Sequence, residues 1–158
     1  MLVERKIRSL ADCEKLAEFL VCLLEPNIFL LLQGELGTGK TTLTQLLAKK
    51  LWIKEKVTSP TFTICQRYQI KNNYYLNHFD FFRLNNSNKL DIFQELTIDN
   101  LNIIEWPEKN PQFWEIKKYI QLKLIKKDSE IRLITLNINF PLDKFQKKKF
   151  TDFFHLII

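Results

Sequence analysis

The hydrophobic positions near the start of the chain recur at the spacing of a helix. Apolar residues stand three and four positions apart after Ser9, which places them on one helical face. They are Leu10, Cys13, Leu16, Ala17, Leu20, Val21 and Leu24. Ser9 suits the N-cap, because its hydroxyl can accept a hydrogen bond from an amide of the first turn. Pro26 and Asn27 predict the end of this helix.

A short apolar run without polar interruption follows. Residues 28–32 read Ile-Phe-Leu-Leu-Leu, which is typical of a strand buried on both faces of a sheet. After a loop that contains glycines, leucines return at helical spacing, at Leu43, Leu46, Leu47 and Leu51. The sequence therefore predicts a parallel strand, a loop and a helix in direct succession.

The middle of the chain alternates with the period of two that strands have. Residues 71–73 predict a turn and residues 74–80 resume extended structure, so we expect a β-hairpin. One phase of its first strand carries Phe62, Ile64, Gln66, Tyr68 and Ile70.

Further elements are expected towards the C-terminus. A short helix is predicted at residues 90–96, and strands at 101–104, 119–125 and 131–138. Beyond Pro141 a basic helix carries a loose apolar stripe, whose docking on the protein body is favoured over membrane binding. The stripe consists of Leu142, Phe145, Phe150, Phe153 and Leu156.

The loop after the first buried strand fits a phosphate-binding motif. Residues 34–41, Gly-Glu-Leu-Gly-Thr-Gly-Lys-Thr, match G-x-x-x-x-G-K-[ST] at every fixed position. Backbone amides of such a loop converge on phosphate oxygens, which requires glycine where a Cβ would block the approach or where φ is positive. Lys40 then reaches the β and γ phosphates, and the Thr41 hydroxyl ligates Mg²⁺.

Composition strengthens this interpretation. The chain has three glycines, and all three lie in this loop, at positions 34, 37 and 39. We therefore predict an α/β protein with a P-loop NTPase fold, whose central, mostly parallel sheet includes antiparallel strands and is flanked by helices. Since no repeat or linker divides the chain, we expect one domain over residues 1–158, with a C-terminal helix within 140–158.

A P-loop also needs a carboxylate near Mg²⁺. Asp80 follows residues 74–79 and Glu105 follows residues 101–104, so both stand at predicted strand ends. Each could instead be an ordinary surface acid at the end of a strand. The pattern alone does not rank the two.

Composition and charge exclude several other classes. Cys13, Cys22 and Cys65 form no Cys-x-x-Cys pair, so neither a zinc site nor a disulfide framework is indicated. No apolar run approaches the about 20 residues of a membrane span, and residues 1–8 lack the apolar segment of a signal peptide. We expect a cytoplasmic protein without a membrane partner.

The net charge of +6 favours a solvated, lysine-rich surface over a nucleic-acid footprint, although lysines cluster at 117–118, 126–127 and 147–149. Residues 88–91, Asn-Lys-Leu-Asp, match the N-K-x-D element that reads guanine in many GTPases. Those GTPases also carry a D-x-x-G switch, and no glycine remains here outside the P-loop. Adenine is therefore the expected base.

Four segments together resemble the bacterial ATPase family required for tRNA threonylcarbamoyladenosine biosynthesis, the TsaE (YjeE) family. They occur in the same order, between Ser9 and about Pro111, and are highly specific as a set. The segments are GELGTGKTT at 34–42, SPTFT at 59–63, HFDFFRL at 78–84 and IEWPE at 104–108.

The resemblance implies roles that the pattern could not rank. It implies that Thr41 and Glu105 ligate Mg²⁺, that residues 59–63 form a nucleotide-sensing switch, and that Asp80 lies beside the γ-phosphate. The implied catalytic residues are Lys40, Asp80 and Glu105. The implied nucleotide-binding residues are Gly34, Glu35, Leu36, Gly37, Thr38, Gly39, Lys40, Thr41, Thr42, Ser59, Thr61 and Trp106.

The chain departs from the family pattern at three places. Phe82 stands where tyrosine is usual, Thr97 stands where a glycine often follows Glu-Leu, and the segment after Pro141 lies outside the match. The loss of the phenolic hydroxyl at Phe82 removes one donor from the switch region.

The expected activity is Mg²⁺-dependent ATP hydrolysis with Asp80 orienting the attacking water. Except for Arg83, no arginine is placed to act as an arginine finger within this chain. We therefore expect slow ATP hydrolysis by the protein alone and faster hydrolysis with partners. By resemblance, the partners are the tRNA threonylcarbamoyl-transfer subunit and its paralogous companion subunit, and tRNA is met indirectly through them.

Two alternatives stay open. A small-molecule or nucleoside kinase uses the same loop, but usually has an arginine-rich lid, and residues 109–127 contain no arginine. A nucleotide-gated binding module would use the basic C-terminal third to contact tRNA or an acidic protein face.

Overall fold

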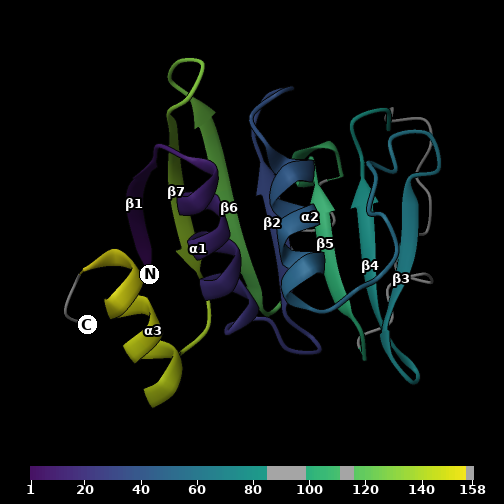
Figure 1. The fold of residues 1–158 in the computed structure, drawn as a ribbon. Coiled ribbons are helices and arrows are strands. Elements are labelled where there is room, and N and C mark those ends of the chain that lie inside the picture. The colour runs from purple at the N-terminus through teal and green to yellow at the C-terminus, as the bar shows by residue number, and fades with distance from the viewer. Residues whose placement is uncertain (85–98, 111–115, 156–158) are drawn as a thin grey trace.

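The computed structural model describes residues 1–84, 99–110 and 116–155. One sheet of seven strands runs through these residues in the order β1-β7-β6-β2-β5-β4-β3 (Figure 1). The strands are β1 Leu2–Ile7, β2 Phe29–Gln33, β3 Cys65–Lys71, β4 Tyr74–Asp80, β5 Leu101–Glu105, β6 Tyr119–Lys126 and β7 Arg132–Ile138. The helices are α1 Leu10–Val21, α2 Lys40–Lys50, the 3₁₀ turn η2 Pro107–Lys109, and α3 Lys144–Phe154.

The centre of the sheet is parallel and both edges are antiparallel. Strand β2 runs parallel to β5 and β6, and β5 runs parallel to β4. The antiparallel pairs are β1 with β7, β6 with β7, and β3 with β4. This confirms the predicted α/β class. Because β2, β4 and β5 run in the same direction, their carboxyl ends lie together at one end of the strands.

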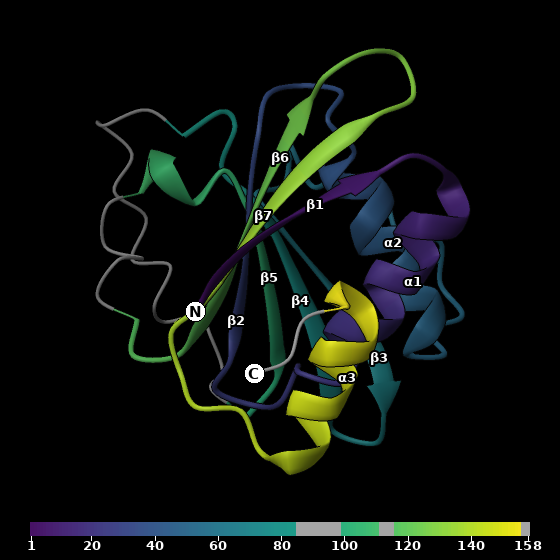
Figure 2. The ribbon, with the colours of Figure 1, turned by 90° about the vertical axis from the view of Figure 1, so that its left-hand side faces the viewer.

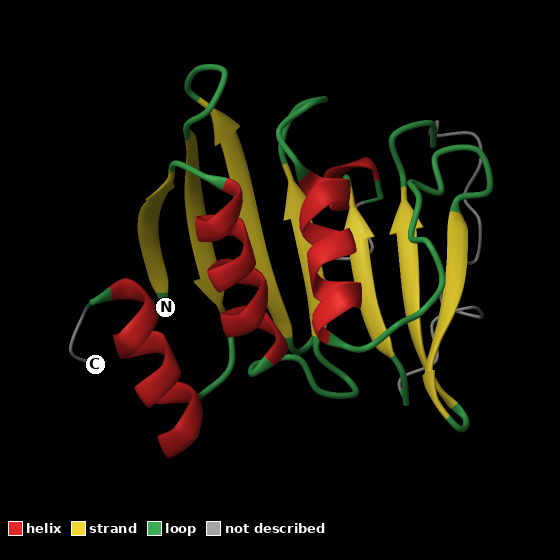
Figure 3. Ribbon diagram, in the orientation of Figure 1, coloured by secondary structure: helices red, strands yellow, loops and turns green. Residues whose placement is uncertain are grey.

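The described α-helices cover one face of the sheet. Helices α1 and α2 lie side by side in front of the strands, and α3 joins them next to α1 (Figures 1 and 2). Leu20 of α1, Leu47 of α2 and Leu30 of β2 are all fully buried in the core between them. The helix and strand boundaries can be followed in Figure 3.

The C-terminal helix docks on the body as predicted. A reciprocal capping box between Asp143 and Gln146 starts it, and its rings pack against Phe19 of α1. The centroid of the Phe19 ring lies 5.0 Å from that of Phe153 and 6.0 Å from that of Phe150. Phe145, which we expected in this stripe, is instead exposed, because it lies outside the helix face that carries Phe150, Phe153 and Phe154.

Several predicted boundaries were wrong. Helix α1 ends at Val21, with Cys22 as its C-cap, rather than at Pro26. Strand β3 begins at Cys65 rather than Phe62, because the amide of Ile64 donates to the carbonyl of Pro60 in a turn. The predicted helix at 90–96, the N-K-x-D element and Thr97 lie outside the described residues.

Strand β1 was not predicted. Burial alternates along the strand: Val3, Arg5 and Ile7 are at least partly buried, and the charged residues between them are exposed. In the described ranges, no helix has both the length and the apolar character that crossing a membrane requires.

Candidate functional site

The phosphate loop lies at the carboxyl ends of the parallel strands. Strand β2 ends at Gln33, and α2 begins at Lys40 directly after the loop. In the parallel register, Leu32 pairs with Glu105, and Glu105 pairs with Asp80. Both candidate carboxylates therefore stand beside the loop, at the edge of the sheet where ligands bind in α/β proteins.

Gly34 is required by the close approach of a neighbouring strand. Its φ is +144°, and a Cβ at this position would lie 2.4 Å from the carbonyl oxygen of Leu124. Gly39 has a φ of +102° and is the N-cap of α2, where no side chain occupies the helix terminus. The first amides of α2 are thus presented to an anion together with the positive end of the helix dipole.

Lys40 holds its ammonium inside the loop. Its Nζ donates to the carbonyl oxygens of Gly34 at 2.7 Å and Glu35 at 3.0 Å, and lies 4.0 Å from the ring centroid of Trp106. Among the described residues Lys40 has no ion pair. Burial lowers the pKa of Lys40, and the nearby carboxylate of Glu105 opposes this shift. An anion bound in the loop would form the ion pair that this buried ammonium lacks.

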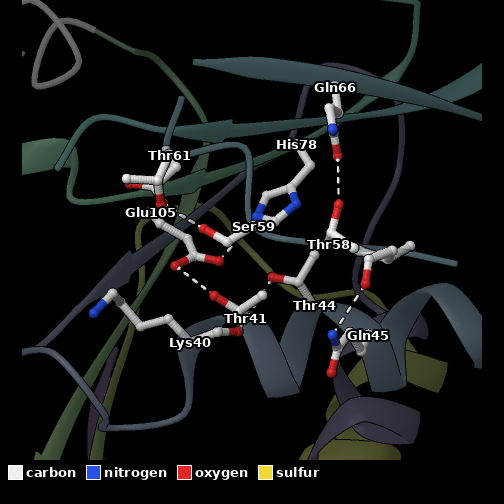
Figure 4. Close-up of polar contacts among 12 residues, drawn as sticks. Lys40, Thr41, Thr44, Gln45, Thr58, Ser59, Thr61, Gln66, His78 and Glu105 are labelled. Atoms are coloured by element: carbon white, nitrogen blue, oxygen red, sulfur yellow. Dashed lines mark hydrogen bonds and ion pairs between the residues drawn. The ribbon is translucent and has the colours of Figure 1, made fainter. Parts of the chain in front are cut away.

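Glu105 is held by two elements at once. Its Oε2 accepts a hydrogen bond from Thr41 Oγ1 at 3.1 Å, and its Oε1 lies 2.8 Å from His78 Nε2 (Figure 4). His78 and Glu105 are both buried, and His78 Nδ1 has no partner within the described residues. A hydrogen on Nε2 would be donated to Glu105.

Asp80 is tied to the SPTFT segment. Its Oδ2 accepts from Ser59 Oγ at 2.7 Å and from Thr61 Oγ1 at 2.5 Å, and its Oδ1 accepts from the amide of Phe82 at 2.9 Å. Ile64, which directly follows this segment, has a φ of +66°. A β-branched residue with positive φ is strained, so the segment that contacts Asp80 is held in a conformation of raised energy.

A pocket of about 270 Å³ opens between these groups. It contains the predicted magnesium ligands and both predicted switch hydroxyls. The lining residues are Leu36, Gly37, Gly39, Lys40, Thr41, Thr42, Ser59, Thr61, Asp80, Phe82, Glu105 and Trp106. The other three predicted residues lie behind it: Gly34 and Glu35 accept from Lys40, and Thr38 faces the other side of the loop.

A second pocket of about 540 Å³ lies on that other side. It shares Gly39 and Thr42 with the first pocket and is otherwise mostly apolar. Arg132 of β7 lines it, and its Nε donates to the carbonyl oxygen of Thr38 at 3.2 Å. This volume suits a nucleoside whose phosphates lie in the loop.

Two residues that contact the candidate site were not among those predicted from the sequence. His78 stands two positions before Asp80 in β4, so the period of two places both on one face, and this signal could have identified it. Arg132 carries no local signal, because its contact with the loop spans 94 positions.

The oxygen ligands fit a hard cation. Within the described residues there is no group of three or more His, Cys, Asp and Glu side chains that could hold a metal by themselves. Mg²⁺ is characteristically bound by one or two protein oxygens together with phosphates and water. Thr41 Oγ1 and Glu105 Oε2 supply such a pair at the pocket.

Comparison with known proteins gives consistent matches. The family model of the threonylcarbamoyl adenosine biosynthesis protein TsaE matches residues 7–134. Proteins named tRNA threonylcarbamoyladenosine biosynthesis protein TsaE are similar to this chain. The one from Nostoc sp. is 37% identical over 109 residues, 65% of each chain. The one from Haemophilus influenzae is 37% identical over 100 residues, 61% of this chain and 63% of the relative.

These two matches span slightly less than two thirds of the relatives' length. A longer match, to the protein of the same name from Rickettsia typhi, is 30% identical over 147 residues and covers 91% of this chain and 94% of the relative. The crystal structure of Bacillus subtilis YdiB superposes with a TM-score of 0.72 at 21% identity, covering 97% of this chain and 94% of that chain. This structural likeness shows the fold.

The space around the loop glycines yields a stability prediction. We expect Gly34→Ala to destabilise the protein by about 2 kcal/mol or more, because the new Cβ would meet the Leu124 carbonyl. Gly37→Ala is the control, since it has a positive φ of 74° but no neighbour within 4 Å, and we expect it to cost about 1 kcal/mol. Urea denaturation without nucleotide measures both. Equal losses would contradict the proposed crowding at Gly34.

Proposed function

The chain belongs to the TsaE family, and on that premise we propose that it is a Mg²⁺-dependent ATPase of tRNA threonylcarbamoyladenosine biosynthesis. The family name already assigns its members to that modification. We propose further that the chain hydrolyses ATP slowly alone and faster with the threonylcarbamoyl-transfer subunit and its companion subunit. Hydrolysis then resets their complex, which carries the tRNA.

The observation that carries this proposal is the contact between Thr41 and Glu105. A hydroxyl from the first turn of α2 and a carboxylate from the end of β5 share one hydrogen bond, beside a buried lysine that has no ion pair in the described structure. An anion-seeking loop and a pair of hard oxygen ligands are what a triphosphate with Mg²⁺ requires. A simple phosphate-binding loop would not need the buried carboxylate.

Each residue has a separate task in the proposed reaction. Lys40 would move from the loop carbonyls to the β and γ phosphate oxygens, where its charge meets the charge of the transition state. Thr41 and Glu105 would hold Mg²⁺, which when bound neutralises those oxygens. Asp80 would orient water, since its oxygens already accept three hydrogen bonds and positioning suits it better than proton abstraction.

The nucleoside is proposed to enter the larger pocket. That pocket continues from the loop through Gly39 and Thr42 and offers an apolar wall from Leu10 and Leu16. An adenine ring would be buried there against aliphatic side chains, while Arg132 fixes the Thr38 carbonyl between base and phosphates.

The rim of the smaller pocket supports partner stimulation. Leu36 is 67% exposed and Phe62 is 81% exposed, although large apolar side chains are normally buried. The guanidinium of Arg83 lies 4.1 Å from the ring centroid of Phe62. A protein docked over this rim would reach Phe62, which directly follows Thr61 and hence the group that binds Asp80.

Hydrolysis measured with and without partners tests the proposal. We expect the two purified partner subunits to raise the ATP turnover of the wild type, and Lys40→Ala and Glu105→Ala to lower it about 100-fold or more. Asp80→Asn should keep ATP affinity and lose stimulated turnover. Full stimulated turnover in Asp80→Asn would remove its assigned role. A phosphorylated acceptor formed in addition to ADP, in place of inorganic phosphate, would favour a kinase.

The exposed rim gives a second prediction. Phe62→Ala should leave unstimulated hydrolysis and ATP affinity unchanged but weaken stimulation about tenfold, because a truncated interface anchor typically costs 1 kcal/mol or more. Phe145→Ala is the matched control, since Phe145 is 58% exposed on α3, away from the site. Titration of partner concentration against turnover measures both. The same loss in both variants would show that the rim is not the docking surface.

A further inference from the structure

The turn after α2 contains a residue that its backbone does not favour. The amide of Ile53 donates to the carbonyl of Ala48, and the amide of Trp52 donates to the carbonyl of Lys49. With Leu51 as the C-cap, these two bonds form a Schellman motif, in which the residue after the cap is usually glycine. Here that residue is Trp52, with a φ of +61°.

The Trp52 side chain makes no hydrogen bond or ring contact with the described part of the chain that would offset this conformation. It is 87% exposed, the highest exposure among the exposed large hydrophobic residues of the described chain. Ile53, the next residue, is buried as the motif requires. A bulky residue held at positive φ and left in water is unfavourable twice, which indicates a use outside the fold.

The surroundings of Trp52 define the chemistry of what it would contact. A hollow of about 550 Å³ lies beside it, lined by Leu46, Ile53, Lys49, Lys50 and Lys54, with Glu14 of α1 at its edge. Lys50 is paired with Glu18 at 3.3 Å. Lys49, Lys54 and Lys56 are exposed, and none of them has an ion pair within the described residues. Glu55 is the exposed acid between the last two.

An exposed flat ring among unpaired ammonium groups suits unpaired RNA. Bases stack on such a ring regardless of sequence, and lysines meet the backbone phosphates. An acidic protein face would use the lysines but would not need a projecting indole beside an apolar hollow. The family's printed link to tRNA gives the choice of probe.

We propose that Trp52, with Lys49, Lys54 and Lys56, forms a direct contact for an unpaired stretch of tRNA. This surface lies at the end of α2 opposite the P-loop (Figure 1). RNA bound there leaves the nucleotide pocket open. The contact is separate from the proposed ATPase, and it differs from the lysine clusters of the C-terminal third.

Trp52→Gly tests the side chain without disturbing the backbone, because glycine is favoured at the positive φ of this position. Its melting temperature should equal or exceed that of the wild type, so weaker binding could not come from unfolding. We expect about tenfold weaker binding of labelled, unmodified tRNA by fluorescence anisotropy at low salt. Trp52→Phe should keep most of the affinity, because it keeps a stacking ring.

Companion variants separate the possible outcomes. In Lys54→Ala, the slope of log binding constant against log salt concentration should fall by about one. Lys147→Ala of α3 should bind tRNA as the wild type does, and Lys40→Ala should still bind it. Unchanged tRNA binding in Trp52→Gly overturns the proposal. Loss of tRNA binding in Lys147→Ala alone also overturns it. If the wild type does not bind tRNA and Trp52→Gly associates more weakly with the partner subunits, the surface is a protein contact and the proposal is wrong. None of these outcomes bears on ATP turnover.

Discussion

The buried carboxylate of Glu105 links the elements on which the site depends. It receives the Thr41 hydroxyl from α2 and lies against His78 of β4, while its own backbone carbonyl accepts from the amide of Phe81. The next residue, Trp106, donates its amide to Leu32 at the end of β2. A carboxylate inside a protein is tolerated only with such partners. The register of three strands and the start of α2 are therefore fixed together with the site geometry.

The scarcity of glycine explains where the chain is strained. All three glycines stand in the phosphate loop, so other positions of positive φ are filled by side-chain-bearing residues. Asn27 and Asn73 occupy such positions in ordinary turns, which asparagine tolerates. Trp106 does so in the candidate pocket, Ile64 does so directly after the segment that contacts Asp80, and Trp52 does so on the surface. His155 does so as the C-cap of α3, where a left-handed residue is usual. Of the described residues with positive φ that are neither glycine nor asparagine, three of four therefore lie at or next to a proposed site.

Local pattern predicted the part of the fold that is local. The strand, loop and helix from Phe29 to Lys50 follow from an apolar run, a motif and leucine spacing, and the strand ends predicted that Asp80 and Glu105 would be candidates. The family resemblance supplied their separate roles. Their meeting at one pocket depends on the parallel register of β2, β5 and β4, which spacing along the chain does not encode. Strand β1 was missed because its pattern is short and highly charged. Arg132 and the larger pocket arise from contacts across the whole chain, which no local pattern encodes.

The most direct test of this account is calorimetric titration of a non-hydrolysable ATP analogue with and without Mg²⁺. The account predicts that Mg²⁺ strengthens binding by the wild type and by Glu108→Gln, whose exposed carboxylate lies near the site. Glu105→Gln should bind the analogue without Mg²⁺ and lose the strengthening. If Glu105→Gln kept the same dependence on Mg²⁺, Glu105 would not be the metal ligand and the central claim would be wrong.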